Sequence, residues 1–391
     1  METDIEPVVD WLTAGAPGAP LSQDILLRLA EKMLAAGVPI ERVAVFVTTL
    51  HPNVMGRGFF WRRGWEEVEV NEADYDLLNT NLYSASPVFG VFKSGKSVRR
   101  LICDPDCPMD YNNLQDLRDE GITDYYMFPL KFTDGLINAA SFATRQPGGF
   151  TDDEMAAIKR IEAPLTLLAE VMAVRRVSVN ILNAYLGHQS GAKVLAGNIK
   201  RGDGEDIHAV IWFCDLRGST PLADSMSRAD FLALLNDYFE CLAGAVLDGG
   251  GEVLRYIGDA ALAIFPVNKE TQNMTEICEQ AVAAANDAVQ RMEDLNKKRA
   301  VEGKDSLGYG IGLHLGDVMY GNIGTPERIE FSVIGAAANE AARIEGKTKD
   351  LGVNFVISED VARHLSGKWI SQGKHALRGV GAEMELFTPG D

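Results

Sequence analysis

Two aspartates each stand at the end of a short apolar run. Asp215 follows residues 209–214, AVIWFC, and Asp259 follows residues 253–257, VLRYI, with one glycine between. Apolar runs of this length, bounded by Gly and Asp, are typical of buried strands. The pattern therefore predicts two strands that each deliver one carboxylate to a strand end. Divalent cations such as Mg²⁺ prefer oxygen ligands, so the pair is a candidate cation site.

A turn of small residues follows the first of these carboxylates. It consists of Gly218, Ser219 and Thr220, and a helical pattern begins beside it. The start of a helix presents free backbone amides, which bind phosphate oxygens. Two carboxylates beside such a turn are what the binding of a triphosphate with divalent cations requires.

The surrounding sequence alternates between helix and strand patterns. Helical patterns cover 227–247, 270–299, 336–345 and 359–365, and strand patterns cover 252–265, 307–320, 328–334 and 354–357. We expect strand pairs to turn at Gly258-Asp259 and at Gly316-Asp317. Strands and helices that alternate, with hairpins inserted, indicate an α+β class with a mixed sheet covered by helices.

Four motifs of the C-terminal half resemble the catalytic domain of class III nucleotidyl cyclases, a ferredoxin-like fold. They are FCDLRGST at 213–220, GG and RYIGD at 249–259, SVIG with Asn339 and Arg343 at 332–343, and LRGV at 377–380. One such motif alone is a weak signal, but four in the right order and spacing are specific. The resemblance implies conversion of a nucleoside triphosphate into a 3′,5′-cyclic monophosphate and pyrophosphate.

The resemblance also assigns metal and phosphate ligands. Asp215 and Asp259 are expected to hold two Mg²⁺ or Mn²⁺ ions per site, with the backbone carbonyl of Leu216 as a further ligand. One ion would lower the pKa of the ribose 3′-hydroxyl, and the other would neutralise the β- and γ-phosphates. The amides around Gly218, Ser219 and Thr220 are expected to cradle phosphate oxygens.

Asn339 and Arg343 are the catalytic residues that the resemblance implies. They are four residues apart, so they share one face of a helix. Asn339 would orient the ribose, and Arg343 would meet the charge that develops on the α-phosphate. Arg378 would contact the terminal phosphates. In this family the metal carboxylates come from one subunit and the Asn/Arg pair from the other, which implies a homodimer with two shared sites.

The residues expected to select the base depart from the usual adenylate pattern. Arg255 stands where Lys is common, and Ser332 stands where Asp or Thr is common. An Arg donor suits N1 of adenine, and a Ser hydroxyl can accept from the exocyclic amine. We therefore expect ATP as the substrate and cyclic AMP as the product. A guanylate cyclase and a catalytically weak nucleotide-binding regulator remain the alternatives.

The N-terminal half resembles a GAF-type sensory domain over roughly residues 20–175. A helical pattern at 21–36 precedes strand patterns at 41–50, 126–132 and 136–143, and Thr151 with Glu154 fits a capping box before a long exit helix. Pro164 predicts a kink or a break in that helix. The resemblance implies regulation by a small-molecule effector, whose identity stays open. The expected domains are 1–175, a helical connector at 176–207 and the catalytic domain at 208–391.

The composition limits the other classes of function. The chain has 391 residues, of which 46% are hydrophobic, and this length and composition favour two globular domains. The net charge of −19 argues against a nucleic-acid binder, which would need a basic surface. No run is long and apolar enough for a membrane span, and the N-terminus lacks the pattern of a signal peptide, so we expect a cytoplasmic protein without a membrane partner. The five cysteines do not suggest disulfides. Whether Cys103, Cys107 or a histidine binds a cofactor stays open.

Overall fold

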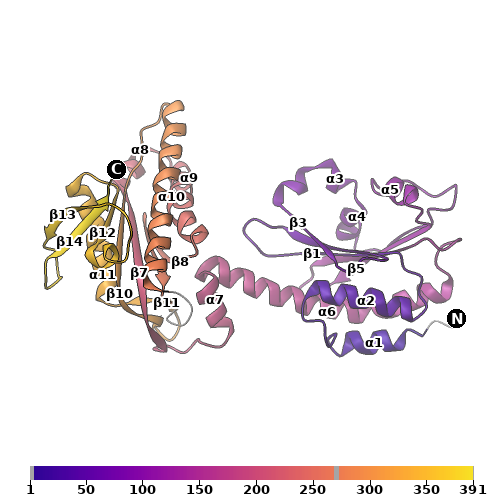
Figure 1. Cartoon of the computed structure of the whole chain (residues 1–391). Helices are drawn as coiled ribbons and strands as arrows, with labels where there is room; N and C mark the ends of the chain where they lie inside the picture. Colours follow the sequence, from indigo (N-terminus) through magenta and orange to yellow (C-terminus); the bar gives the residue numbers. More distant parts are fainter. Residues whose placement is uncertain (1–3, 268–272, 391) are drawn as a thin grey trace. The chain divides into compact units, whose positions relative to one another are not determined.

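The computed structural model describes residues 4–267 and 273–390. The chain divides into two compact units, Met1–Ala184 and Tyr185–Asp391 (Figure 1). This division falls inside the stretch in which we expect the connector. The two units are described separately below.

The first unit is built on a six-stranded antiparallel sheet with the strand order β3-β2-β1-β6-β5-β4. The strands are β1 (Arg42–Thr48), β2 (Gly56–Arg62), β3 (Glu69–Ala73), β4 (Val98–Arg100), β5 (Asp124–Lys131) and β6 (Ile137–Thr144). The expected strands at 41–50, 126–132 and 136–143 are confirmed. Residues 71–125, which no periodic pattern covers, contain β4, part of β3 and several short helices.

Helices cover both faces of this sheet (Figure 1). One face packs against α1 (Glu6–Thr13), α2 (Ser22–Ala35) and α6 (Asp152–Leu186), and the other carries α3 (Asn81–Ser84), α4 (Pro87–Ser94) and α5 (Leu114–Asp119). A single 3₁₀ turn, η1 (Tyr75–Asn79), precedes α3. Each face has its own apolar core, so this half of the chain has the layers of an α+β domain.

The predicted capping box at the start of α6 is present. The Thr151 amide donates to Glu154 Oε2 at 2.8 Å, and the Glu154 amide donates to Thr151 Oγ1 at 3.3 Å. The helix then continues through Pro164 as one element. Of the expected kink or break, the break is therefore wrong, and the apolar contacts of α6 with the sheet continue to Leu165 and Leu168, beyond the proline.

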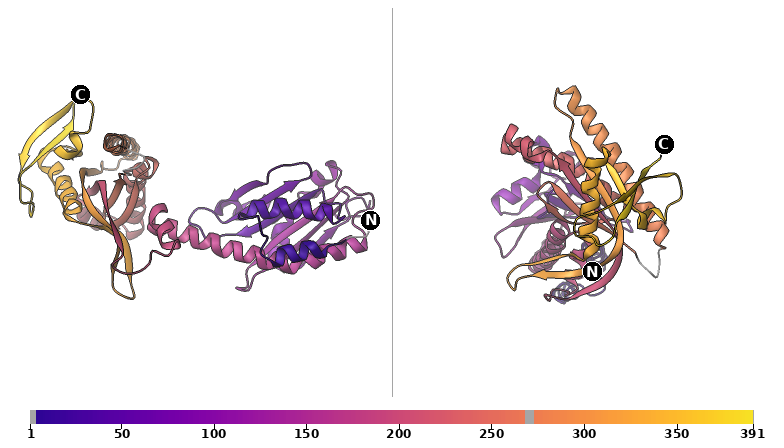
Figure 2. Two further views of the ribbon diagram at one scale, coloured as in Figure 1. Left: turned by 60° about the horizontal axis from the view of Figure 1, so that its bottom comes forward. Right: turned by 90° about the vertical axis from the view of Figure 1, so that its left-hand side faces the viewer.

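The second unit contains a mixed sheet with the strand order β13-β14-β12-β10-β7-β9-β8, and β11 pairs with β10 outside this path. The C-terminal strands β13 and β14, yellow in Figure 2, form one edge of the sheet. The strands are β7 (Gly204–Arg217), β8 (Glu252–Ile257), β9 (Ala260–Pro266), β10 (Gly308–Gly324), β11 (Ile329–Ile334), β12 (Phe355–Ser358), β13 (Trp369–His375) and β14 (Met384–Pro389). The β10–β12 pair is parallel and the other pairs are antiparallel. The expected mixed sheet is confirmed.

The helices of this unit pack on opposite faces of the sheet according to the alternation of β7. Val210, Trp212 and Cys214 point into the core beneath α9 (Arg228–Asp248) and α10 (Met274–Val301). Ala209 and Ile211 point to the other face, towards α11 (Ala336–Leu351). Because side chains alternate along a strand, Asp215 must lie on the α11 face.

The expected turn at Gly316-Asp317 is wrong. β10 runs without a turn from Gly308 to Gly324 and pairs with β7 from Gly308 to Gly321. A Cβ at Gly316 would lie 2.6 Å from the Cβ of Ala337, so this glycine allows α11 to approach the strand closely. The Gly-Asp pair therefore marks a helix contact and not a hairpin.

The short helix α7 (His188–Leu195) is attached to the sheet through a buried carboxylate. Glu252 Oε1 accepts hydrogen bonds from the amide and hydroxyl of Ser190, each at 2.8 Å, and Glu252 Oε2 accepts one from the Tyr320 hydroxyl at 2.7 Å. All three residues are buried. The bonds satisfy a carboxylate that would otherwise be costly to bury, and they fix the start of α7 to β8.

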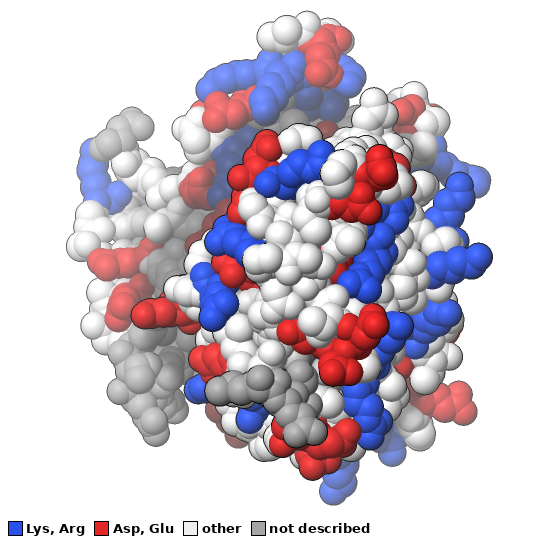
Figure 3. Space-filling model, turned by 90° about the vertical axis from the view of Figure 1, so that its right-hand side faces the viewer, with Lys and Arg blue, Asp and Glu red and all other residues white. Residues whose placement is uncertain are grey.

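Two properties of the described residues concern membrane and nucleic-acid partners. No helix among them is both long and apolar enough to cross a membrane. On the face that Figure 3 shows, the described Lys and Arg side chains are mixed with Asp and Glu and do not form one continuous basic field.

Candidate active site

Asp215 and Asp259 come together at one end of the sheet. β7 and β9 pair up to Cys214 and Ala261, so Asp215, near the end of β7, meets the β8–β9 turn that contains Asp259. Burial raises the pKa of Asp215 to about 6, and the neighbouring charge of Asp259 acts in the same direction. The two carboxyl groups are therefore adjacent, as the sequence predicts.

A third carboxylate, which was not predicted from the sequence, lies near this pair. Glu345 of α11 is buried, and burial followed by the charge of Asp215 raises its pKa to about 7. Its carboxylate fills the space above Gly310, the ladder partner of Asp215. A signal was available in the sequence, since Glu345 lies at helical spacing from the apolar residues Ala337, Ala341 and Ile344, which α11 buries against the sheet.

The acidic pair fits the divalent cations that the resemblance implies. Two neighbouring carboxylates repel each other when both are ionised, and a divalent cation bound to them would compensate their negative charge. Leu216 buries its side chain in the opposite core, so only its backbone can face the pair. Among residues 4–267 and 273–390, no group of three or more His, Cys, Asp or Glu residues is arranged to hold an ion. Backbone, water or nucleotide oxygens would have to complete the coordination.

The predicted phosphate turn lies beside Asp215. Gly218 has a φ of 69°, the left-handed conformation that glycine adopts without strain, and it precedes α8 (Ser219–Ser225). Ser219 and Thr220 therefore form the first turn of this helix. Thr220 is exposed and Ser219 is partly exposed, so solvent can reach the turn.

One of the two expected base-selecting residues, Arg255, forms an ion pair with a residue of the strand that carries the other. Arg255 Nε lies 2.8 Å from Glu330 Oε1, and Glu330 stands two residues before Ser332 on β11, so Glu330 and Ser332 point to the same face. The Ser332 hydroxyl is fully buried and has no hydrogen-bond partner among the described residues. A buried hydroxyl without a partner is costly, which is consistent with a polar ligand at this position. Glu330 was not identified from the sequence.

The expected catalytic pair is not brought to the carboxylates within one chain. Asn339 and Arg343 lie on α11 as predicted, but both are exposed, on the side of the helix away from Glu345 and the sheet. Arg343 forms no ion pair with any residue that the structure describes. Arg378 is also exposed, in the segment between β13 and β14. One chain therefore holds the acidic half of the site and presents the Asn/Arg half to solvent.

Comparison with known proteins gives a consistent match for this unit. Residues 205–388 match the family described as the adenylate and guanylate cyclase catalytic domain. An adenylate cyclase of Anabaena cylindrica is 36% identical over 173 residues, which are 43% of this chain and 33% of that protein. An uncharacterized protein of Mycobacterium tuberculosis is 33% identical over 190 residues, 48% of this chain and 34% of that protein. The chain thus spans about a third of the length of these relatives.

Solved structures of cyclases also resemble the chain. The adenylyl cyclase CyaB from P. aeruginosa has a TM-score of 0.44 at 22% identity and covers 48% of this chain and 96% of its own. A bacterial light-regulated adenylyl cyclase has a TM-score of 0.49 at 18% identity, over 66% of this chain and 83% of its own. On the family match, residues 205–388 belong to the class III adenylate and guanylate cyclase catalytic domains.

Proposed function

We propose that the protein is an adenylate cyclase, which converts ATP to 3′,5′-cyclic AMP and pyrophosphate. The observation that carries the proposal is the adjacency of the Asp215 and Asp259 carboxyl groups at the end of the central strands. The family match supports the reaction class, and the relative named adenylate cyclase supports ATP over GTP.

The acidic pair would hold two Mg²⁺ or Mn²⁺ ions. When bound, these ions make the ribose 3′-hydroxyl easier to deprotonate and neutralise the triphosphate. Asp215 and Asp259 position them at the strand ends, and Glu345 adds negative charge behind Asp215. The turn from Gly218 to Thr220 lies next to Asp215, where its amides can meet phosphate oxygens.

The exposed Asn339 and Arg343 support a homodimer. A pair that faces away from the carboxylates of its own chain can complete the site of a second copy. There Asn339 would orient the ribose, and the Arg343 guanidinium would stabilise the negative charge that develops during cyclisation. Arg378 is proposed to contact the terminal phosphates of the bound nucleotide.

The residues around the expected base site also support a second candidate function, guanylate cyclase. The observation that favours it is the position of Glu330 beside Arg255. Arg255 and Ser332 suit adenine, for the reasons given from the sequence. Glu330, however, partly neutralises Arg255 and brings a carboxylate to the same face as the Ser332 hydroxyl. A carboxylate accepts from the N1–H and amino donors of guanine. We favour ATP because Arg255 is itself a donor in this site.

The deciding experiment incubates the purified chain with Mn²⁺ and either ATP or GTP and quantifies both cyclic nucleotides. Cyclic AMP that exceeds cyclic GMP, and that disappears in Asp215→Asn, supports the proposal. The opposite ratio supports the guanylate alternative. If the chain binds nucleotide but converts neither ATP nor GTP, the result supports the remaining alternative, a catalytically weak nucleotide-binding regulator.

We also propose that the N-terminal unit is a GAF-like regulatory domain for a small-molecule effector. Its layered sheet, the capping box at Thr151 and the long helix α6 support this proposal. A truncated chain that begins at Tyr185 should differ in basal rate from the full chain. Equal rates per catalytic unit would contradict a regulatory role under the conditions of the assay.

A further inference from the structure

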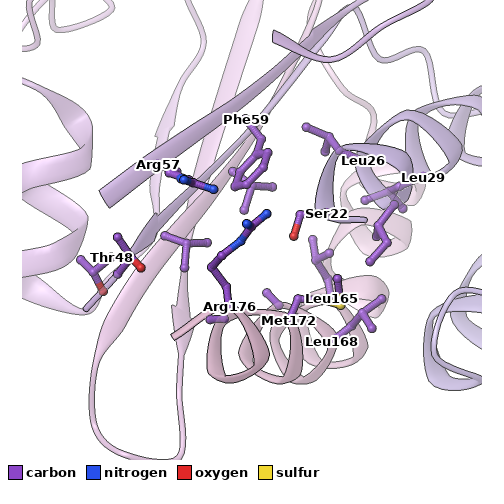
Figure 4. Close-up of a pocket in the computed structure, with 16 residues that line it drawn as sticks. Ser22, Leu26, Leu29, Thr48, Arg57, Phe59, Leu165, Leu168, Met172 and Arg176 are labelled. Carbon is purple, nitrogen blue, oxygen red and sulfur yellow. The ribbon is translucent and has the colours of Figure 1, made fainter. Parts of the chain in front are cut away.

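The first unit contains a cavity of about 70 Å³ between α2, α6 and the sheet, shown in Figure 4. Its floor is apolar, and its mouth carries arginines and hydroxyl groups. The apolar lining includes Leu26, Leu29, Phe59, Leu165, Leu168 and Met172. All lining residues belong to the unit Met1–Ala184, so the cavity does not depend on the catalytic unit.

Two guanidinium groups lie at the polar end of this cavity. Arg57 enters from β2 and Arg176 from α6, and both side chains point towards the space beside Phe59 (Figure 4). Partial burial lowers the pKa of Arg176 and the positive charge of Arg57 lowers it further, whereas the negative charge of Glu72 raises it. Two cations are thus held at the end of an apolar cavity.

The carboxylates nearby do not balance these charges. Glu72 pairs with Arg57 Nη2, but the buried Arg57 Nε has no hydrogen-bond partner among the described residues. Within 4.0 Å, Arg176 has no carboxylate partner in the described part of the chain. Arg57 is partly buried and Arg176 is exposed at the mouth. The site therefore has two guanidinium groups and one carboxylate, and a buried donor of Arg57 is left without a partner, which is costly unless a ligand accepts from it.

We propose that this cavity binds a monocarboxylate with a short, unbranched apolar chain. The carboxylate would lie between Arg57 and Arg176, since a guanidinium binds a carboxylate through two parallel hydrogen bonds. The chain would lie among Leu26, Phe59 and Leu165. A cavity of about 150 Å³ holds one benzene molecule, which has six carbons, so this space of about 70 Å³ suits a chain of about three carbons.

This inference is independent of the proposed cyclase activity, and binding alone can test it. Isothermal titration calorimetry of the full chain would use acetate, butanoate, hexanoate and octanoate, with butylamine and butan-1-ol as probes of the charge. We expect the tightest binding for butanoate, weaker binding for acetate, hexanoate and octanoate, and no measurable heat with butylamine. Equal binding of butylamine and butanoate would overturn the proposal.

Two variants separate the polar end of the cavity from its apolar part. Arg176→Gln should weaken butanoate binding at least tenfold, whereas Arg63→Gln, at an exposed arginine elsewhere in the unit, should not change it. Ala169→Leu fills the cavity from α6 and should abolish the dependence on chain length, with Ala163→Leu on the exposed side of the helix as its control. Butanoate binding that is unchanged in both Arg176→Gln and Ala169→Leu would show that the site lies elsewhere.

Discussion

Gly310 is the ladder partner of Asp215, and the space in which a Gly310 side chain would lie is filled by the carboxylate of Glu345. The acidic pair of the strand ends and the buried acid of α11 therefore lie on one face of the sheet. Two positions without side chains, Gly310 and Gly312, allow the helix to come close enough for this contact.

Gly310→Ala should destabilise the catalytic unit by about 1–3 kcal/mol, because the new methyl group collides with the Glu345 carboxylate and the Thr348 hydroxyl. Gly312→Ala should cost more, since its methyl group would meet the backbone amide of Glu345 at 2.5 Å. Chemical denaturation, followed by circular dichroism, gives both values.

Gly346→Ala is the matched control for these two variants. Gly346 lies within α11, and a Cβ added there would meet no neighbour within 4 Å, so alanine should stabilise the helix by about 0.5–1 kcal/mol. If all three substitutions changed the free energy of unfolding equally, the close helix–strand approach would not be what limits positions 310 and 312.

Asp215→Asn should stabilise the metal-free protein above pH 6. The folded-state pKa of Asp215 is raised from 3.8 to about 6, so its proton favours the folded state, and that stability is lost as the pH rises from about 4 through 6. The asparagine in the variant cannot ionise, so the variant does not lose this stability as the pH rises. Thermal melts in EDTA should therefore show a larger Tm advantage for Asp215→Asn at pH 7.5 than at pH 5.5.

Divalent cations should reverse that advantage. With saturating Mn²⁺ at pH 7.5, the wild-type Tm should rise and that of Asp215→Asn should rise little, because the variant lacks one of the two proposed metal carboxylates. A variant whose Tm rises with Mn²⁺ as much as the wild type would rule out Asp215 as a metal ligand.

Mixing two inactive variants tests the shared site. Asp215→Ala and Arg343→Ala should each lose cyclase activity, and a refolded equimolar mixture should regain about a quarter of the wild-type rate, because half of the dimers are mixed and each has one intact site. The double variant Asp215→Ala/Arg343→Ala, mixed with wild type, is the control for assembly. A mixture that stays inactive while mass spectrometry detects mixed dimers would exclude the trans arrangement.

Glu330→Gln should shift the nucleotide preference towards ATP, on the order of tenfold in the ratio of kcat/KM values. The substitution releases Arg255 from its ion pair and removes the carboxylate that would accept from guanine. Competition assays with ATP and GTP at equal concentration measure the ratio. A ratio that stays constant would indicate that Glu330 does not face the base.

The sequence predicts best what depends on local pattern. The side chains of β7 alternate between two buried faces of the sheet. The apolar run alone therefore predicts that Asp215 lies near the strand end, whichever face its side chain is on. The Thr151–Glu154 cap and the helix around Asn339 and Arg343 are similarly local and are present as expected. The cyclase resemblance of the C-terminal half is confirmed by the family match.

The features that were not predicted depend on contacts between distant segments. Glu345 acquires its environment only when α11 packs over Gly310, and Glu330 becomes relevant only when β11 lies near Arg255. The wrong turn at Gly316 has the same origin, since a glycine needed for a close helix contact has the same local signature as a glycine in a turn.

The strand β8 carries three features at once. At its start, Glu252 holds the first turn of α7; in its middle, Arg255 belongs to the proposed base site; and just beyond its end stands Asp259. A movement of α7 would reach both later positions through the same six-residue strand. Such a movement would shift Arg255 and Asp259 together. A regulatory signal that acts on α7 would therefore change nucleotide preference and metal binding at the same time, and not one of them alone.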